Sequence, residues 1–169
     1  MHPCPPRPVA RLNLEPLLTP MIAFRSLVPA AAVLALVGCT TVPTPSPRES
    51  AALAVLKSDA GVHEKARACQ ELADFGGPAA VPALAGLLSH EQLSDYARSG
   101  LESIPDASAA AALRQALGGL SGRQLAGAVN SLGVRRDSAA VPDLQRLALD
   151  PGRGAAAEAV ASLGLIGNA

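Results

Sequence analysis

The chain has 169 residues, of which 35 are Ala and 25 are Leu, and both residue types favour helices. Aromatic residues make up only 2%, and 14 basic side chains balance 14 acidic ones. This composition disfavours a β-sandwich or barrel, which needs β-branched and aromatic residues. It also disfavours a nucleic-acid partner, which would need a basic face or aromatic stacking platforms. We therefore expect an all-α protein.

The segment that ends at Cys39 has the three parts of a secretory signal. Arg25 supplies a positive charge, residues 27–37 form an uncharged apolar run, and Gly38 is a small residue before the cysteine. A helix of this length spans about 16 Å, which is too short for the ~30 Å hydrocarbon core of a bilayer. The segment therefore predicts export rather than a membrane-spanning helix.

The tetrapeptide Leu36-Val37-Gly38-Cys39 resembles the bacterial lipobox. The resemblance implies cleavage before Cys39 and attachment of several acyl chains to it, enough for stable membrane anchoring. It also implies secretion across the bacterial inner membrane, with the protein facing the periplasm or the cell surface and the outer membrane favoured. A generic signal peptide and a chance Gly-Cys pair are the alternatives.

These segments predict the domain organisation. Residues 1–38 form the leader, and Met21 is the expected true start because the proline-rich stretch before it does not suit a helix. A long basic amino-terminal region is the alternative. Residues 39–50 form a tether whose alternating prolines favour an extended spacer. Residues 51–169 form the folded domain.

Leucines recur in this domain with a period near 30 residues. One ladder consists of Leu72, Leu101, Leu132 and Leu163, and a second consists of Leu84, Leu113 and Leu144. Two ladders with one period predict units of two helices whose leucines form one continuous core.

Local signals predict where the helices begin and end. A short first helix is expected between Pro47 and Lys57. Ser108 and Ser138 are expected to cap the second helices of their units. Helix breaks are expected at Gly76-Gly77-Pro78, Ile104-Pro105-Asp106, Gly118-Gly119, Gly133 and Asp150-Pro151-Gly152.

The repeated strings Val81-Pro82-Ala83-Leu84, Val141-Pro142-Asp143-Leu144 and Ala159-Val160-Ala161-Ser162-Leu163-Gly164 resemble HEAT repeats of the short, phycobilisome-lyase-like bacterial type. The resemblance covers about residues 58–169 and implies an α-solenoid of about three and a half helical hairpins. The middle copy departs from the pattern, with Glu102 where a glycine is expected. The last repeat is incomplete, so we expect either a longer natural protein or another chain on this face.

No residue pattern indicates catalysis, a cofactor, a metal ion or a small-molecule substrate. His63-Glu64 and His90-Glu91 lack the second histidine of a zinc-protease motif. Cys69 has small apolar neighbours and is expected to be a buried thiol.

Four polar side chains are candidate contacts with a protein partner, namely Arg98, Asn130, Arg135 and Arg136. The alternative is that they make hydrogen bonds and ion pairs between neighbouring units. The expected contact surface is the ridge of second helices, at residues 79–89, 108–117 and 138–149.

These expectations predict a non-catalytic protein–protein interaction scaffold that is lipid-anchored in the bacterial envelope. The first alternative is an accessory arm of a larger enzyme or electron-transfer protein whose catalytic part lies beyond Ala169. The second is a lyase-like enzyme, which the lack of paired catalytic residues disfavours.

Overall fold

The computed structural model describes residues 44–167, and this part of the chain contains eight α-helices, three short 3₁₀ helices and no strand. The α-helices are α1 (Pro47–Lys57), α2 (Val62–Phe75), α3 (Val81–Ala85), α4 (Ser94–Ser103), α5 (Ala107–Ala116), α6 (Gly122–Val134), α7 (Val141–Ala148) and α8 (Ala156–Gly167). The 3₁₀ helices are η1 (Pro78–Ala80), η2 (Ser138–Ala140) and η3 (Pro151–Arg153). The predicted all-helical fold is confirmed for these residues. The leader and Cys39 lie outside them.

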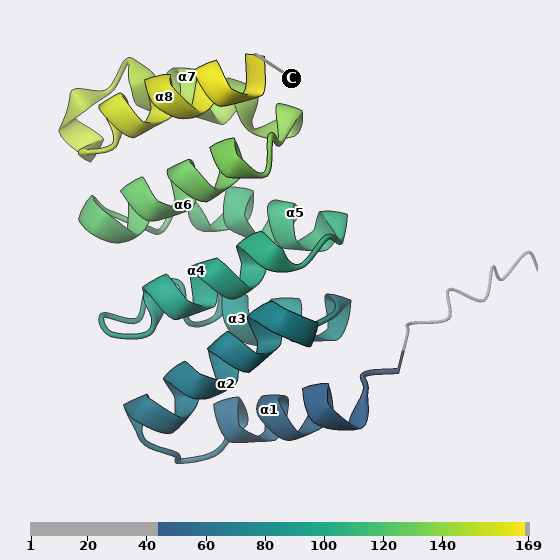
Figure 1. The fold of residues 1–169 in the computed structure, drawn as a ribbon. Coiled ribbons are helices and arrows are strands. Elements are labelled where there is room, and N and C mark those ends of the chain that lie inside the picture. The colour runs from purple at the N-terminus through teal and green to yellow at the C-terminus, as the bar shows by residue number, and fades with distance from the viewer. Residues whose placement is uncertain (1–43, 168–169) are drawn as a thin grey trace, which may run out of the picture. The chain divides into compact units, whose positions relative to one another are not determined.

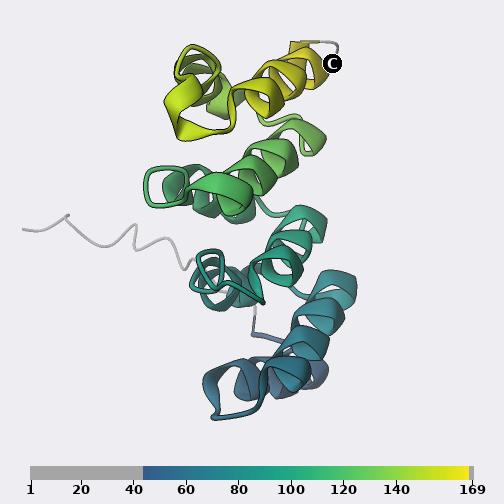
Figure 2. The same cartoon turned by 90° about the vertical axis from the view of Figure 1, so that its left-hand side faces the viewer.

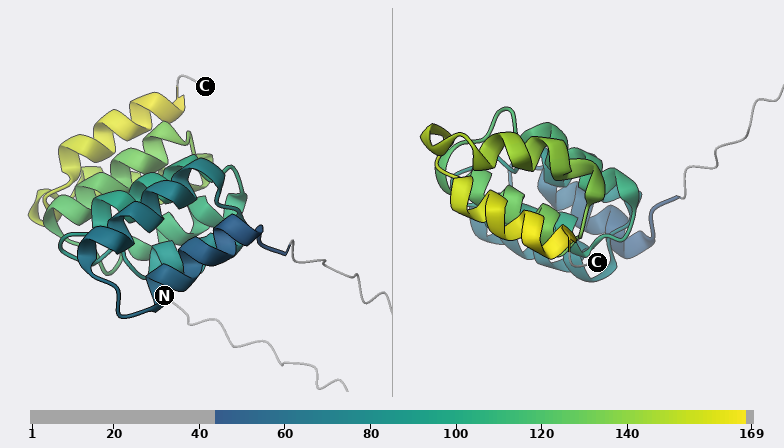
Figure 3. Two further views of the ribbon diagram at one scale, coloured as in Figure 1. Left: turned by 60° about the horizontal axis from the view of Figure 1, so that its bottom comes forward. Right: turned by 90° about the horizontal axis from the view of Figure 1, so that it is seen from above.

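The helices pack against neighbours in chain order. Helices α2, α4, α6 and α8 lie one after another, and each contacts the next (Figure 1). Helix α1 packs on α2, α3 on α4 and α5, and α7 on α8. Figure 2 shows the same succession from the side, and the view from one end shows α7 and α8 side by side (Figure 3). Within residues 44–167, no helix is long and apolar enough to cross a bilayer.

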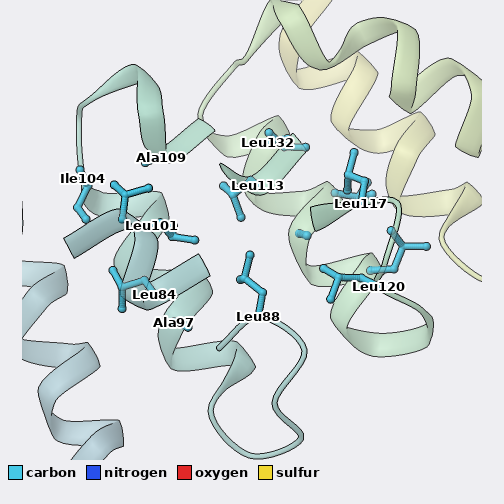
Figure 4. Close-up of a cluster of buried hydrophobic side chains, with 14 of the residues drawn as sticks. Leu84, Leu88, Ala97, Leu101, Ile104, Ala109, Leu113, Leu117, Leu120 and Leu132 are labelled. Atoms are coloured by element: carbon cyan, nitrogen blue, oxygen red, sulfur yellow. The ribbon is translucent and has the colours of Figure 1, made fainter. Parts of the chain in front are cut away.

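The leucine ladders form the core of this unit. Leu72, Leu101 and Leu132 are each fully buried, whereas Leu163 on α8 is only half-buried. All three leucines of the second ladder are fully buried too, as Figure 4 shows for Leu84 and Leu113 around Leu101. Burying one leucine stabilises a fold by roughly 1.5–3 kcal/mol. These helices have at most 14 residues, and isolated helices this short are only marginally stable in water. The burial of leucines between neighbouring helices is therefore what stabilises them.

Prolines and glycines end the helices mostly where the sequence predicts. Pro82 and Pro142 lie in the first turns of α3 and α7, where a missing amide donor costs little. Helix α2 stops before Gly76-Gly77, and α4 stops before Ile104.

The break predicted at Gly133 comes one residue later, because α6 continues through Gly133 and ends at Val134. This glycine serves packing. A Cβ atom at Gly133 would lie 2.6 Å from the Ser162 hydroxyl oxygen on α8, closer than real side chains approach. The residue is small because two helices approach each other closely there.

The caps predicted at Ser108 and Ser138 are wrong. Asp106 precedes α5, and its Oδ1 accepts the backbone N–H of Ser108 at 2.8 Å. Asp137 precedes η2, and its Oδ1 accepts the N–H of Ala139 at 3.3 Å. Aspartate caps as well as serine does, and here the carboxylate lies at the position where the first free N–H groups need an acceptor.

The core assignment can be tested by truncating one buried leucine. Leu101→Ala is expected to lower the free energy of unfolding by about 2–5 kcal/mol, because it removes a fully buried side chain and leaves a cavity. Leu149→Ala is the matched control, because Leu149 is 86% exposed, and its effect should stay within about 0.5 kcal/mol. Urea unfolding followed by circular dichroism measures both. Equal effects of the two changes would contradict this core.

Candidate functional site

Arg98, one of the four candidate contact residues, takes part in a polar network between α4 and α6. Its Nη1 donates to the Ser131 hydroxyl at 3.0 Å and to Glu102 Oε2 at 3.5 Å. The Ser131 hydroxyl in turn donates to the same Glu102 oxygen at 2.7 Å. The side chain passes so close to Gly127 that a Cβ there would lie 2.9 Å from Nε. Helical spacing places Arg98 and Glu102 on one face of α4, and α6 packs against that face.

Arg135, at the end of α6, binds the carboxyl end of α4. Its Nη1 donates to the carbonyl oxygens of Leu101 at 2.9 Å, Glu102 at 2.8 Å and Ile104 at 2.6 Å. Its Nη2 donates to the carbonyl oxygen of Asp106 at 3.0 Å. The last carbonyl groups of a helix have no partner within the helix. One guanidinium therefore satisfies a helix end and the turn that follows it.

The other two candidates, Asn130 and Arg136, are exposed. Arg136 has φ of 50°, in the left-handed region, and its N–H donates to the Gly133 carbonyl oxygen at 2.9 Å. This conformation turns the chain out of α6 and brings Asp137 to its capping position, where it also pairs with Arg114 on α5. Asn130 and Arg136 are therefore the two candidates whose side chains face solvent.

The structure thus separates the four candidates into two pairs. Arg98 and Arg135 make hydrogen bonds between successive helices, which is the alternative that the sequence left open for them. Asn130 and Arg136 stay available for a contact with another molecule.

Three residues with the same linking role were not identified from the sequence. Glu49 on α1 is only 5% exposed, and its Oε1 accepts the Gly77 N–H at 2.9 Å in the turn after α2. Arg153 in η3 donates from Nη2 to the Leu117 carbonyl oxygen at 2.7 Å, after the end of α5. Arg114 pairs with Asp137. The available signal was weak: the separations from the partners are 28 residues for Glu49, 36 for Arg153 and 23 for Arg114, and only the first is close to the leucine period.

Asp106 adds an electrostatic feature to the contact between Arg135 and the turn after α4. Hydrogen bonds from Ser108, from its side chain first and then from its backbone N–H, hold the pKa of the Asp106 carboxyl below its usual range, with Arg135 adding a smaller effect. The carboxylate stays charged under ordinary conditions, which suits its role as helix cap. Its contribution to stability is lost as the pH falls through this lowered pKa.

Cys69 is a fully buried free thiol on α2. Burial raises its pKa from 9.0 to about 11, because the thiolate would lose its hydration. The folded chain therefore favours the protonated thiol, and the contribution of this group to stability falls as the pH rises above 9.0. A thiol of this kind serves packing, because nucleophiles and redox groups need accessible thiolate.

The two histidines within residues 44–167 lie in exposed positions. His90 accepts the backbone N–H groups of Gln92 and Leu93 at 3.2 and 3.3 Å and so caps a turn before α4. His63 is exposed at the start of α2. Among residues 44–167, no group of three or more His, Cys, Asp or Glu side chains is placed to hold a metal ion.

The surface has shallow hollows between neighbouring helices. A hollow of about 320 Å³ lies between α5 and α7 and is lined by residues that include Arg114, Asp143, Arg146 and Arg153. These arginines already pair with carboxylates or bind carbonyl oxygens. Another, of about 450 Å³ between α2 and α4, contains Tyr96, which is 39% exposed. Neither hollow gathers groups that point to a small-molecule reaction.

Comparison of the chain with protein-family models, with curated proteins and with solved structures gave no match.

The link between α6 and α4 can be tested with Arg135→Lys. A lysine keeps the charge but offers one nitrogen, which cannot bind four carbonyl oxygens at once. We expect the free energy of unfolding to fall by about 1.5–3 kcal/mol. Arg123→Lys is the control, because that side chain is 68% exposed and its loss should cost less than about 1 kcal/mol. Denaturant titration measures the free energy of unfolding of both variants. Equal decreases for Arg135→Lys and Arg123→Lys would refute the link between α6 and α4.

The state of Cys69 predicts its reactivity. In the folded chain at pH 8, iodoacetamide should leave Cys69 unmodified, because the thiol is buried and its pKa is about 11. In concentrated urea the same residue should react fully. Peptide mass spectrometry resolves Cys69 from the other two cysteines. Equal labelling rates with and without urea would show that the thiol is accessible in the folded chain.

Proposed function

We propose that this chain is a HEAT-like α-solenoid that serves as a non-catalytic protein–protein interaction scaffold, lipid-anchored through Cys39 in the bacterial envelope. Four kinds of support are available: repeated contacts between helices, the exposed ridge of second helices, the reactivity of the side chains, and the pattern of the leader.

The observation that carries the scaffold proposal is the repetition of contacts between successive helices. Ser131 on α6 accepts from Arg98 on α4, 33 residues earlier, and Ser162 on α8 donates to the Val129 carbonyl oxygen on α6, also 33 residues earlier. Arg135 and Arg153 bind the helix ends that lie 34 and 36 residues before them. Such contacts between nearest neighbours, with one period, are typical of stacked repeat units.

The exposed ridge supports a binding role. Helices α3, α5 and α7 form a row of short helices on one side of α4, α6 and α8. The α5–α7 hollow carries charges of both signs at Asp143 and Arg146, and Leu149 beside it is 86% exposed. Stacked repeats present extended surfaces of this kind to protein partners. The buried, protonated thiol of Cys69 gives such a surface no nucleophile.

The anchor proposal is supported by the sequence of the leader. The apolar run and the Leu36-Val37-Gly38-Cys39 string fit lipid attachment at Cys39. Alternating prolines separate Cys39 from Ser46, whose side chain caps α1. A spacer of this length would hold the helices about 20 Å from a membrane surface.

Replacing the proposed lipid attachment site tests the anchor. Cys39→Ser expressed in a bacterial host should leave the membrane fraction, because no acyl chains would hold it. Cys69→Ser is the matched control and should stay with the membrane. Fractionation with immunoblotting measures this, and intact mass spectrometry should show a mass increase of several acyl chains only when Cys39 is present. Membrane retention of Cys39→Ser with no lipid on the parent would contradict the proposal.

The same intact mass distinguishes the main alternative. A mass that agrees with acylated residues 39–169 favours a small anchored scaffold. A larger mass, with peptides that continue beyond Ala169, favours an accessory arm of a larger enzyme or electron-transfer protein.

A further inference from the structure

The ring of His90 holds the turn between α3 and α4. Its Nδ1 accepts the backbone N–H of Gln92 at 3.2 Å and that of Leu93 at 3.3 Å. The carbonyl oxygen of His90 accepts the N–H of Ser94, the first residue of α4, at 3.1 Å. The start of a helix leaves N–H groups without a partner in the helix, and here one residue accepts three of them.

Helices α2 and α6 start without such a side chain. Gly61 before α2 and Ser121 before α6 accept the corresponding backbone N–H, from Lys65 at 3.1 Å and from Leu125 at 3.3 Å. No side chain caps either helix. Of these three helix starts, only that of α4 is held by a titratable group.

The two bonds to the ring require a neutral imidazole. In neutral histidine one ring nitrogen carries a hydrogen and the other accepts, so Nδ1 accepts only while the hydrogen is on Nε2. In the imidazolium both nitrogens carry a hydrogen and neither accepts. Protonation would therefore point an N–H of His90 at the N–H groups of Gln92 and Leu93. Histidine ordinarily changes charge between about pH 5 and about pH 8.

The ring is open to solvent, whereas the residues beside the turn belong to the core. His90 is exposed. Leu88, whose side chain points into the core in Figure 4, is 2% exposed, and Leu93 is 1% exposed. The turn thus connects a ring that can be protonated with two buried leucines.

Three charged side chains surround the turn: Glu91 within it, Asp95 in the first turn of α4, and Arg123 on α6. Arg123 donates from Nη2 to the Glu91 carbonyl oxygen at 3.2 Å and pairs with Asp95 at 3.4 Å. Helix α3, before the turn, has no charged residue. Because the charges of Arg123 and Asp95 offset each other, the loss of the two hydrogen bonds is the main consequence of protonation.

Helix α2, which packs on α4, is the other neighbour with charged groups. Among the described residues, none of its side chains forms an ion pair or a hydrogen bond with the turn. Its histidine and charged residues are His63, Glu64, Lys65, Arg67, Glu71 and Asp74.

We propose that the turn between α3 and α4, residues 86–93, is a pH-sensitive element of the fold, ordered while His90 is neutral and loosened when its imidazole is protonated. Loosening would free the start of α4 and the Glu91 carbonyl oxygen that Arg123 binds. A proton on one side chain would thereby weaken the contact between this turn and α6. The inference depends neither on the scaffold function nor on the lipid anchor.

Amide hydrogen exchange of the full chain, resolved by NMR, tests this turn. Protection of the Gln92 and Leu93 N–H groups, corrected for intrinsic exchange, should fall by at least about threefold from about pH 8 to about pH 5, since a lost hydrogen bond corresponds to roughly this factor or more. In His90→Asn the fall should vanish, because the asparagine Oδ1 is attached to Cγ as Nδ1 is, caps helices well and accepts at either pH.

His63→Asn is the matched control, because His63 is exposed at the start of α2, and it should show the same fall as the parent chain. The Leu132 N–H, in the centre of α6, is the internal reference and should keep its protection. Four results would overturn the proposal: no fall in the parent chain, an equal fall in His90→Asn, a fall that His63→Asn abolishes, or a fall of the same size at Leu132.

Discussion

The guanidinium of Arg135, bound to four backbone carbonyl oxygens at the end of α4 and in the turn after it, is the interaction that fixes α6 on α4. Short helices leave a large share of their carbonyl groups without partners. Here the carbonyl groups at the end of α4 accept hydrogen bonds from Arg135 at the end of α6, and Arg153 donates in the same way to carbonyl groups after α5. Hydrogen bonds of this kind set the position of each helix along its neighbour, while the buried leucines supply most of the stabilisation of the fold.

Small residues set how closely the helices approach. Gly133 allows α8 to lie against α6, and Gly127 makes room for Arg98 between α4 and α6. The same arrangement explains how a chain with almost no aromatic residues builds a core: it uses close contacts between alanine, glycine and leucine rather than large side chains. It also leaves exposed apolar residues on α8, at Val160 and Leu165.

The sequence was sufficient to predict the helical class, the first helix and the burial of Leu72, Leu101 and Leu132. Buried positions recur at a regular spacing, and leucines occupy them. It was insufficient at Gly133, where a glycine indicates either a helix break or a close approach, and only the position of α8 decides. Asp106 was overlooked as a cap because Ser108 follows two positions later and either residue type can serve. For Arg98 and Arg135 the sequence left two interpretations open, since their partners lie about 30 residues away.

The stabilisation of neighbouring helices by one another can be tested most directly by native-state hydrogen exchange with peptide-level mass spectrometry. Contacts limited to nearest neighbours predict that the outer helices, α1 and α8, open first, and that α4 and α6, covered on both sides, keep the highest amide protection. Protection of α4 and α6 no higher than that of α1 and α8 would contradict this account.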